Sequence, residues 1–206
     1  MRQDRPLVGV LALQGDFDAH RKALAGDGAG SIEVRGPSDL EGIAGLVLPG
    51  GESTAMLKLL EGTGLDSGLA DLIRAGLPVL ATCAGVILLA REVRHPVQRS
   101  LGLLDVQVER NGYGRQIDSA VVPLEVAEPD GLGTPTLEGV FIRAPRVTHV
   151  GPGVRVLARR DGDPVLLRQQ KVLAATFHPE LSPGSPVIDL FLRTVRNGSA
   201  PHTERT

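Results

Sequence analysis

The sequence predicts an α/β protein with an open, mainly parallel sheet, helices on both faces and added antiparallel strands in its second half. Short apolar runs alternate with helical patterns through the first half of the chain, and such alternation is typical of parallel sheets with right-handed crossovers. The runs are apolar at consecutive positions, as expected of strands buried on both faces. The second half is richer in strand-like runs, which accounts for the antiparallel addition.

The expected strands of the first half are at 7–13, 32–34, 46–48 and 78–81. The expected helices are at 16–24 and 85–93, with another that begins at Ser53 as its N-cap. The expected elements of the second half are strands at 106–108, within 121–126, and at 140–142, 154–157, 165–167 and 172–177, and a helix at 187–195. The Pro- and Gly-rich stretch 128–139 is expected to be a surface loop. We expect one domain over residues 1–196 and a disordered tail over 197–206.

The composition is that of an ordinary globular protein. Of 206 residues, 42% are hydrophobic and 22% charged, and the net charge of -2 provides no basic field for nucleic acid. No stretch approaches the ~18 consecutive apolar residues of a membrane span, and the N-terminal run lacks the cleavage site of a signal peptide. The single cysteine excludes an intramolecular disulfide and a multi-cysteine metal site. We therefore expect a cytoplasmic protein without nucleic-acid or membrane partners, metal or organic cofactor.

Cys83 lies in PVLATCAGVILLA, where an apolar strand leads directly into an apolar helix. A residue at this junction lies on a tight turn at the carboxyl edge of the sheet, beside the unpaired N–H groups of the helix start. That setting favours the nucleophilic thiolate, and Gly85 allows the sharp turn of a nucleophile elbow. The alternative is a buried, inert cysteine, which is the commoner fate of a lone thiol.

A nucleophilic cysteine needs a base, and His178 is the best candidate. It follows the strand VLAATF and opens His178-Pro179-Glu180. Residues two apart in an extended segment point the same way, so Glu180 could orient the imidazole as the third member of a triad. A turn with a solvated histidine and glutamate remains the alternative. His20 is expected on the first helix, and His149 near a strand end.

A third segment, LVLPGGESTAM, places a sharp turn at the carboxyl end of a strand. The turn at Gly50 and Gly51 exposes backbone N–H groups that could stabilise an oxyanion. Glu52 and Ser53 could contact a polar amino-acid substrate. The alternative interpretation is a helix-capping turn.

Together, these segments resemble the class I, triad-type glutamine amidotransferases, which implies a flavodoxin-like sheet. The closer resemblance is to the glutaminase subunits of pyridoxal phosphate synthase, over 7–195. It rests on GVLALQGDFDAH, LVLPGGESTAM, TCAGVILLA, ERNGYGRQIDS, VFIRAP and FHPEL. RNxxGRQxDS and FIRAP are the specific motifs, because other amidotransferases share only the elbow and the HPE.

The resemblance implies that Cys83 is the nucleophile, His178 the general base and acid, and Glu180 its orienting partner. The N–H groups of Gly51 and Ala84 would form the oxyanion hole. The implied glutamine-contacting residues are Gly51, Glu52, Ser53, Arg110, Ile142 and Arg143. Hydrolysis of L-glutamine would proceed through a thioester, and the ammonia would pass to a synthase subunit in a hetero-oligomeric complex that makes pyridoxal phosphate. Arginine suits carboxylate recognition, although either arginine could be an ordinary surface residue.

The chain departs from the family pattern at Ala19, Ala81 and Ala120, which affects expectations for the elbow and the partner interface but not for the triad. Three alternatives stay open. They are a cysteine peptidase or other hydrolase on the same fold, a non-catalytic binding subunit, and a glutaminase that serves another synthase.

Overall fold

The computed structural model describes residues 5–110, 112, 120–127 and 129–198. Within them, five strands pair in parallel in the order β2-β1-β3-β4-β12. Their bounds are β1 Leu7–Leu11, β2 Gly30–Val34, β3 Gly45–Leu48, β4 Val79–Thr82 and β12 Val172–Ala175. β3, β4 and β12 are buried at every position, which confirms the interpretation of their apolar runs as central strands.

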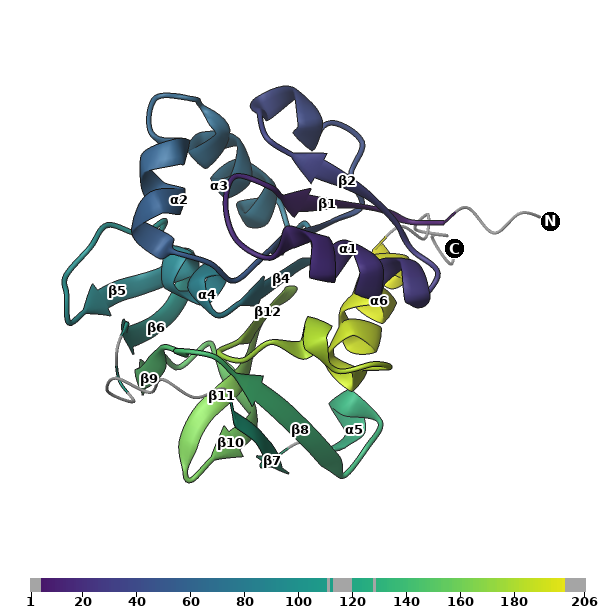
Figure 1. Cartoon of the computed structure of the whole chain (residues 1–206), viewed down its shortest axis with the longest axis vertical. Coiled ribbons are helices and arrows are strands. Elements are labelled where there is room, and N and C mark those ends of the chain that lie inside the picture. Colours follow the sequence, from purple (N-terminus) through teal and green to yellow (C-terminus); the bar gives the residue numbers. More distant parts are fainter. Residues whose placement is uncertain (1–4, 111, 113–119, 128, 199–206) are drawn as a thin grey trace, which may run out of the picture.

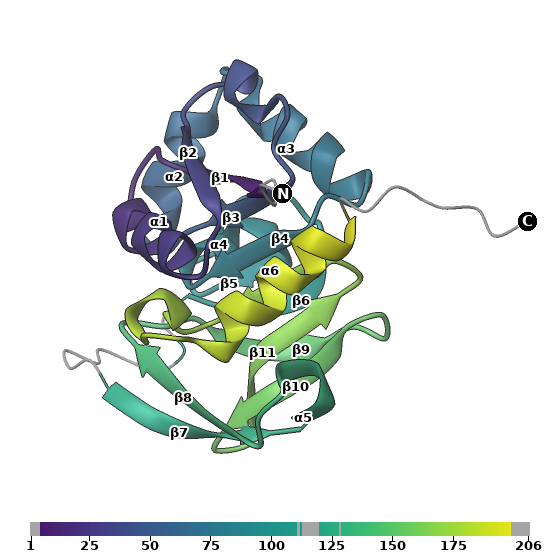
Figure 2. The same ribbon diagram turned by 90° about the vertical axis from the view of Figure 1, so that its right-hand side faces the viewer.

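Helices cover both faces of this parallel part (Figures 1 and 2). One face is covered by α1 Phe17–Gly26 and α6 Pro186–Gly198. The other is covered by α2 Ser53–Leu60, α3 Leu65–Arg74 and α4 Ala84–Leu89. Two short 3₁₀ helices, η1 Pro37–Leu40 and η2 Pro179–Leu181, complete the connections.

The large sheet continues beyond β12 through four antiparallel pairings, in the order β12-β11-β10-β7-β8. These strands are β11 Asp163–Gln169, β10 Arg155–Arg160, β7 Ala120–Val126 and β8 Thr136–Phe141. The sheet therefore has nine strands over the described residues and is mixed, as expected from the strand-rich second half. A separate small sheet contains β5 Ala90–Arg94, β6 Leu104–Glu109 and β9 Arg146–Val150.

Three sequence-based expectations are wrong in detail. The helix expected at 85–93 ends at Leu89, because the chain then forms β5 and pairs with β6. The stretch 128–139 is not simply a loop, since it contains α5 Pro129–Leu132 and most of β8, which pairs along its length with β7. Ser53 is the first residue of α2 rather than its N-cap, because the Glu52 carboxylate accepts from the N–H groups of Thr54 and Ala55.

Two further elements were not expected, namely α3 and β9. At the end of the chain α6 extends to Gly198, and 199–206 lie outside the described residues. Most of the RNGYGRQIDS segment also lies outside them, at 111 and 113–119. No helix within the described ranges is both long and apolar enough to span a bilayer.

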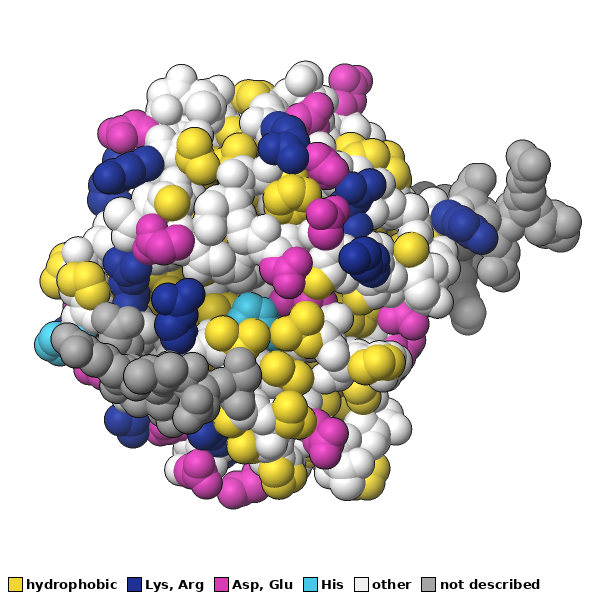
Figure 3. Space-filling model, in the orientation of Figure 1, with side chains coloured by type: hydrophobic (Ala, Val, Ile, Leu, Met, Phe, Trp, Pro, Cys, Tyr) yellow, Lys and Arg dark blue, Asp and Glu magenta, His cyan; other side chains and the backbone are white. Residues whose placement is uncertain are grey.

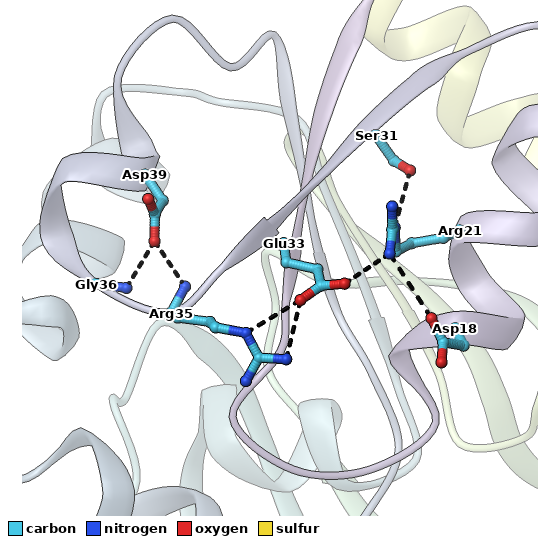
Figure 4. A network of polar contacts seen from close by, with 7 residues as sticks. All are labelled: Asp18, Arg21, Ser31, Glu33, Arg35, Gly36 and Asp39. Atoms are coloured by element: carbon cyan, nitrogen blue, oxygen red, sulfur yellow. Dashed lines mark hydrogen bonds and ion pairs between the residues drawn. The ribbon is translucent and has the colours of Figure 1, made fainter.

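β2 forms one edge of the large sheet, and charged side chains surround it (Figure 4). Glu33 accepts from Arg21 of α1 at 2.6 Å through one oxygen and from Arg35 at 2.9 Å through the other. Asp39 accepts from the backbone N–H groups of Arg35 and Gly36. Charged side chains of this kind discourage edge-to-edge pairing with another sheet.

Candidate active site

Cys83 lies in a nucleophile elbow between β4 and α4. Its backbone has φ 46° and ψ -105°, and its side chain is almost fully buried. A non-glycine residue with positive φ is strained, and such strain is held only where the surrounding structure enforces it. Here the enforcing contact is close packing against β3, because a Cβ on Gly85 would meet the carbonyl oxygen of Leu48. The predicted elbow is therefore present in the fold.

His178 lies beside Cys83 because β4 and β12 are neighbouring parallel strands. Thr82 is paired with Ala175, so the segments that follow both strands reach the same edge of the sheet. The imidazole of His178 and the side chain of Cys83 both lie against Gly50, and Nδ1 of His178 lies 2.7 Å from Oε1 of Glu180. His178 and Glu180 were expected in an extended segment, but a 3₁₀ turn brings them together instead.

Charge stabilises this arrangement despite its burial. Burial alone would lower the pKa of His178, but hydrogen bonds to Cys83 and Glu180, with their charges, raise it to about 10. Burial alone would raise the pKa of Glu180, but its contacts with His178 and His20 lower it to about 2. The opposed shifts favour an imidazolium beside a carboxylate, which is how a triad orients its base.

A second histidine lies behind Glu180. His20, on α1, is fully buried, with Nε2 3.0 Å from Oγ1 of Thr82 and 3.3 Å from Oε1 of Glu180. His20 lies on the first helix, as predicted, although the sequence alone indicated no role for it. Its signal was a polar side chain four residues before Leu24, on the buried face of the helix.

The turn after β3 lies against the triad. A Cβ on Gly50 would lie 2.6 Å from Cε1 of His178, so only glycine allows this approach. Gly51 has φ 150°, and the following N–H, of Glu52, donates to Oε1 of Gln14 at 2.6 Å. Gln14 follows β1 and is a pocket residue to which the sequence analysis gave no role. Its position after a parallel strand, like that of Gly51, was the available signal.

The other predicted substrate-contacting residues surround the same space. Nη2 of Arg110 lies 2.7 Å from Oε1 of Glu52, and Nη1 donates to Thr54. The Ile142 carbonyl oxygen lies 3.9 Å from Sγ of Cys83. Arg143 is exposed and has φ 45°, a strained conformation in the rim of the site.

A pocket of about 310 Å³ joins these residues. It is lined by Gln14, Asp16, Gly50, Gly51, Glu52, Ser53, Cys83, Ile87, Arg110, Ile142, Arg143, His178 and Leu181. The structure thus brings eight of the ten predicted site residues to one cavity. The remaining two adjoin it, since Glu180 lies behind His178 and Ala84 begins α4 directly after Cys83.

Two observations bear on other ligands. Within the described ranges, no group of three or more His, Cys, Asp or Glu side chains is placed to hold a metal ion. Figure 3 shows acidic and basic side chains interspersed over one face, with apolar side chains gathered below its centre. Among the described side chains on that face there is no extended basic patch of the kind that binds nucleic acid.

The sequence matches known proteins over nearly its whole length. The model of the SNO glutamine amidotransferase family matches residues 10–197. A relative from Koribacter versatilis, named pyridoxal 5'-phosphate synthase subunit PdxT, is 54% identical over 94% of this chain and 97% of its own. The protein of the same name from Deinococcus radiodurans is 50% identical over 90% and 95%.

Solved structures agree with these matches. A crystal structure of a glutamine amidotransferase has a TM-score of 0.84 and 46% sequence identity, covering 92% of this chain and 98% of its own. The structure of PurLQS from Thermotoga maritima has a TM-score of 0.69 at 18% identity, over 94% and 98%, and shows a shared fold alone.

Proposed function

The chain belongs to the SNO glutamine amidotransferase family, and from this premise we propose that it is the glutaminase subunit of a pyridoxal 5'-phosphate synthase. It hydrolyses L-glutamine to L-glutamate and passes the ammonia to a synthase subunit. The observation that best supports this proposal is the contact of Cys83, His178 and Glu180 beside a pocket of amino-acid size.

In the proposed reaction, the Cys83 thiolate attacks the side-chain amide carbon of glutamine. The N–H groups of Gly51 and Ala84 hold the oxyanion, for which a preorganised pair of backbone donors is suited. His178 protonates the departing ammonia, which leaves a thioester on Cys83. His178 then takes a proton from a water molecule, and this water attacks the thioester and releases glutamate. Glu180 keeps the proton of His178 on Nδ1 between these steps.

Substrate recognition in this proposal uses the rim of the pocket. Arg110 would bind the α-carboxylate of glutamine, because its guanidinium lines the pocket and can pair with both oxygens of a carboxylate. Glu52 and Ser53 are suited to the α-amino group and side-chain amide of the substrate. Ile142 and Arg143 also line the cavity.

The partner and the compartment belong to the same proposal. Ammonia released into water would be diluted, so a synthase subunit must bind at or near the pocket to receive it. A cytoplasmic location suits a catalytic thiol, because that compartment keeps cysteines reduced.

The test measures glutamate release by the chain alone, by the chain with its synthase subunit, and by the same complex carrying Cys83→Ala. We expect a higher rate in the complex than in the isolated chain, and a rate lowered roughly 10⁴-fold or more by Cys83→Ala. Removing one buried sulfur should leave the unfolding midpoint nearly unchanged. Undiminished glutamine hydrolysis by Cys83→Ala would refute the assignment of the nucleophile, and equal rates with and without the partner would refute activation.

A further inference from the structure

His20 contacts the triad from the side opposite the pocket. It has no exposed surface and does not line the cavity. Its Nε2 lies 3.3 Å from Oε1 of Glu180, and this same oxygen lies 2.7 Å from Nδ1 of His178. One carboxylate oxygen therefore lies between two imidazole rings.

The surroundings of Nε2 determine which nitrogen of His20 carries the proton. Nε2 faces two oxygen atoms, Oε1 of Glu180 and Oγ1 of Thr82. A lone pair on Nε2 would point at a carboxylate oxygen, and two acceptors facing each other in a buried site are costly. The proton therefore lies on Nε2, which donates to Thr82 and directs its N–H toward Oε1 of Glu180, 3.3 Å away. Nδ1 has no hydrogen-bond partner in the described part of the chain.

The Glu180 carboxylate has few other supports. Its side chain is fully buried, and its Oε2 has no hydrogen-bond partner among the described residues. A second cavity, of about 330 Å³, borders it, and the charged side chains that line this cavity, Lys22 and Asp27, form no ion pair with Glu180 within that part of the structure. Within the described part of the chain, the carboxylate makes one side-chain hydrogen bond, with His178, and the contact with His20 is its other close polar support.

The hydrogen bond between His20 and Thr82 also connects His20 to the strand that leads to Cys83. Thr82 is the last residue of β4, fully buried, and directly precedes Cys83. His20 therefore connects the strand that leads to the nucleophile with the carboxylate that orients the base, although these lie almost a hundred residues apart in sequence.

We propose that His20 is a positioning residue of the triad, whose Nε2–H holds the Glu180 carboxylate toward His178 and ties it to the strand that ends at Cys83. The inference rests on the proposed glutaminase function. His20 touches neither the pocket nor the reacting atoms, so its loss should lower kcat and leave KM for glutamine unchanged.

The test compares His20→Leu with His20→Gln in the complex with the synthase subunit. Glutamine can place an amide N–H close to the position of Nε2–H, whereas leucine fills the space without a donor. A hydrogen bond to a buried charge should matter by about tenfold to a hundredfold in kcat, so His20→Leu should lose this much and His20→Gln should stay within about threefold. His149→Leu, on the exposed face of β9, is the matched control and should behave as the native chain.

Two spectroscopic measurements on the isolated full chain complete the test. The downfield proton resonance of His178 Nδ1–H should move or broaden in His20→Leu and persist in His20→Gln. Nitrogen spectra of histidine-labelled native chain should assign the proton of His20 to Nε2, which requires no variant and stays decisive if His20→Leu does not fold.

Three results would overturn the proposal. The first is a native His20 with its proton on Nδ1, and the second is a folded His20→Leu variant with native kcat and a native His178 Nδ1–H resonance. The third is an equal loss of kcat in both variants with an unmoved His178 resonance, which would indicate that His20 acts by packing alone. A native complex that releases no glutamate would instead refute the proposed function, while the two spectroscopic measurements would still decide the position of the His20 proton.

Discussion

Two regions contribute to the candidate site in different ways. The catalytic edge, meaning Cys83, His178 and Glu180, follows parallel strands in the middle of the large sheet. The recognition arm, meaning Arg110, Ile142 and Arg143, follows β6 of the small sheet and β8 at the outer end of the large one.

The two regions differ most in burial and in support. The side chains of the catalytic edge are buried, and a hydrogen bond joins His178 to Glu180. Arg110 keeps some exposed surface, and Arg143 is exposed. Chemistry that needs precise placement therefore rests on buried central strands, whereas the proposed substrate contacts of the recognition arm lie at more exposed strand ends. Changes in the first region should affect folding and kcat, and changes in the second should affect KM.

The largest effect should follow from altering the elbow with Gly85→Ala. The added methyl would meet the Leu48 carbonyl oxygen of β3, which cannot move without disturbing the centre of the sheet. We expect unfolding by urea to show a loss of about 3 kcal/mol, at the upper end for overpacking, together with loss of glutamine hydrolysis. Gly153→Ala, where a Cβ would meet nothing within 4 Å, is the control and should change stability by less than about 0.5 kcal/mol. A Gly85→Ala protein of native stability would show that the elbow is less rigid than its packing indicates.

The same contrast in burial explains how far the sequence could predict the structure. The central strands β3, β4 and β12 were predictable because both of their faces are buried, so their apolar runs are uninterrupted. The neighbourhood of Cys83 and His178 followed from the topology, since parallel strands end at one edge. The resemblance to a family, rather than any local pattern, pointed to Arg110 and Arg143.

Elements that depend on distant partners could not be predicted. The apolar run 85–93 reads as a single helix, and its change to β5 at Ala90 requires pairing with β6. Only the end of β8 was expected as a strand, at 140–142, and its first residues, which include Gly139, read as a loop until β7 supplies their hydrogen bonds. By contrast, α3 has helical spacing at Leu65, Leu69 and Ile73, so its signal was present in the sequence.

The second prediction concerns the recognition arm. Arg110→Met removes the guanidinium that bridges Glu52 and Thr54, which we propose to bind the glutamine carboxylate. We expect KM to rise about tenfold to a hundredfold, as for loss of a hydrogen bond to a charged group, with kcat within a few fold of native. Arg74→Met is the control, because Arg74 lies on the surface of α3 and pairs with Asp71. A fall in kcat at unchanged KM would instead assign Arg110 to catalysis, and the catalytic edge and the recognition arm would then not differ in function.

The smallest effect should appear in the acid dependence of stability, which compares a carboxylate from each region. The pKa of Glu180 is lowered from 4.5 to about 2, so its contribution is fully present above pH 4.5 and is lost as the pH falls toward 2. Between about pH 5 and about pH 3.5 this amounts to about 1 kcal/mol, measurable as the difference between native chain and Glu180→Gln in urea unfolding. Burial would raise the pKa of Glu52, but the N–H groups of Ala55 and Thr54 lower it. Because its side chain is half exposed, solvent screens it, and Glu52→Gln should change the acid dependence less. If Glu180→Gln and Glu52→Gln changed the acid dependence of the free energy of unfolding equally, the buried site would lower a carboxylate pKa no more than a surface site does.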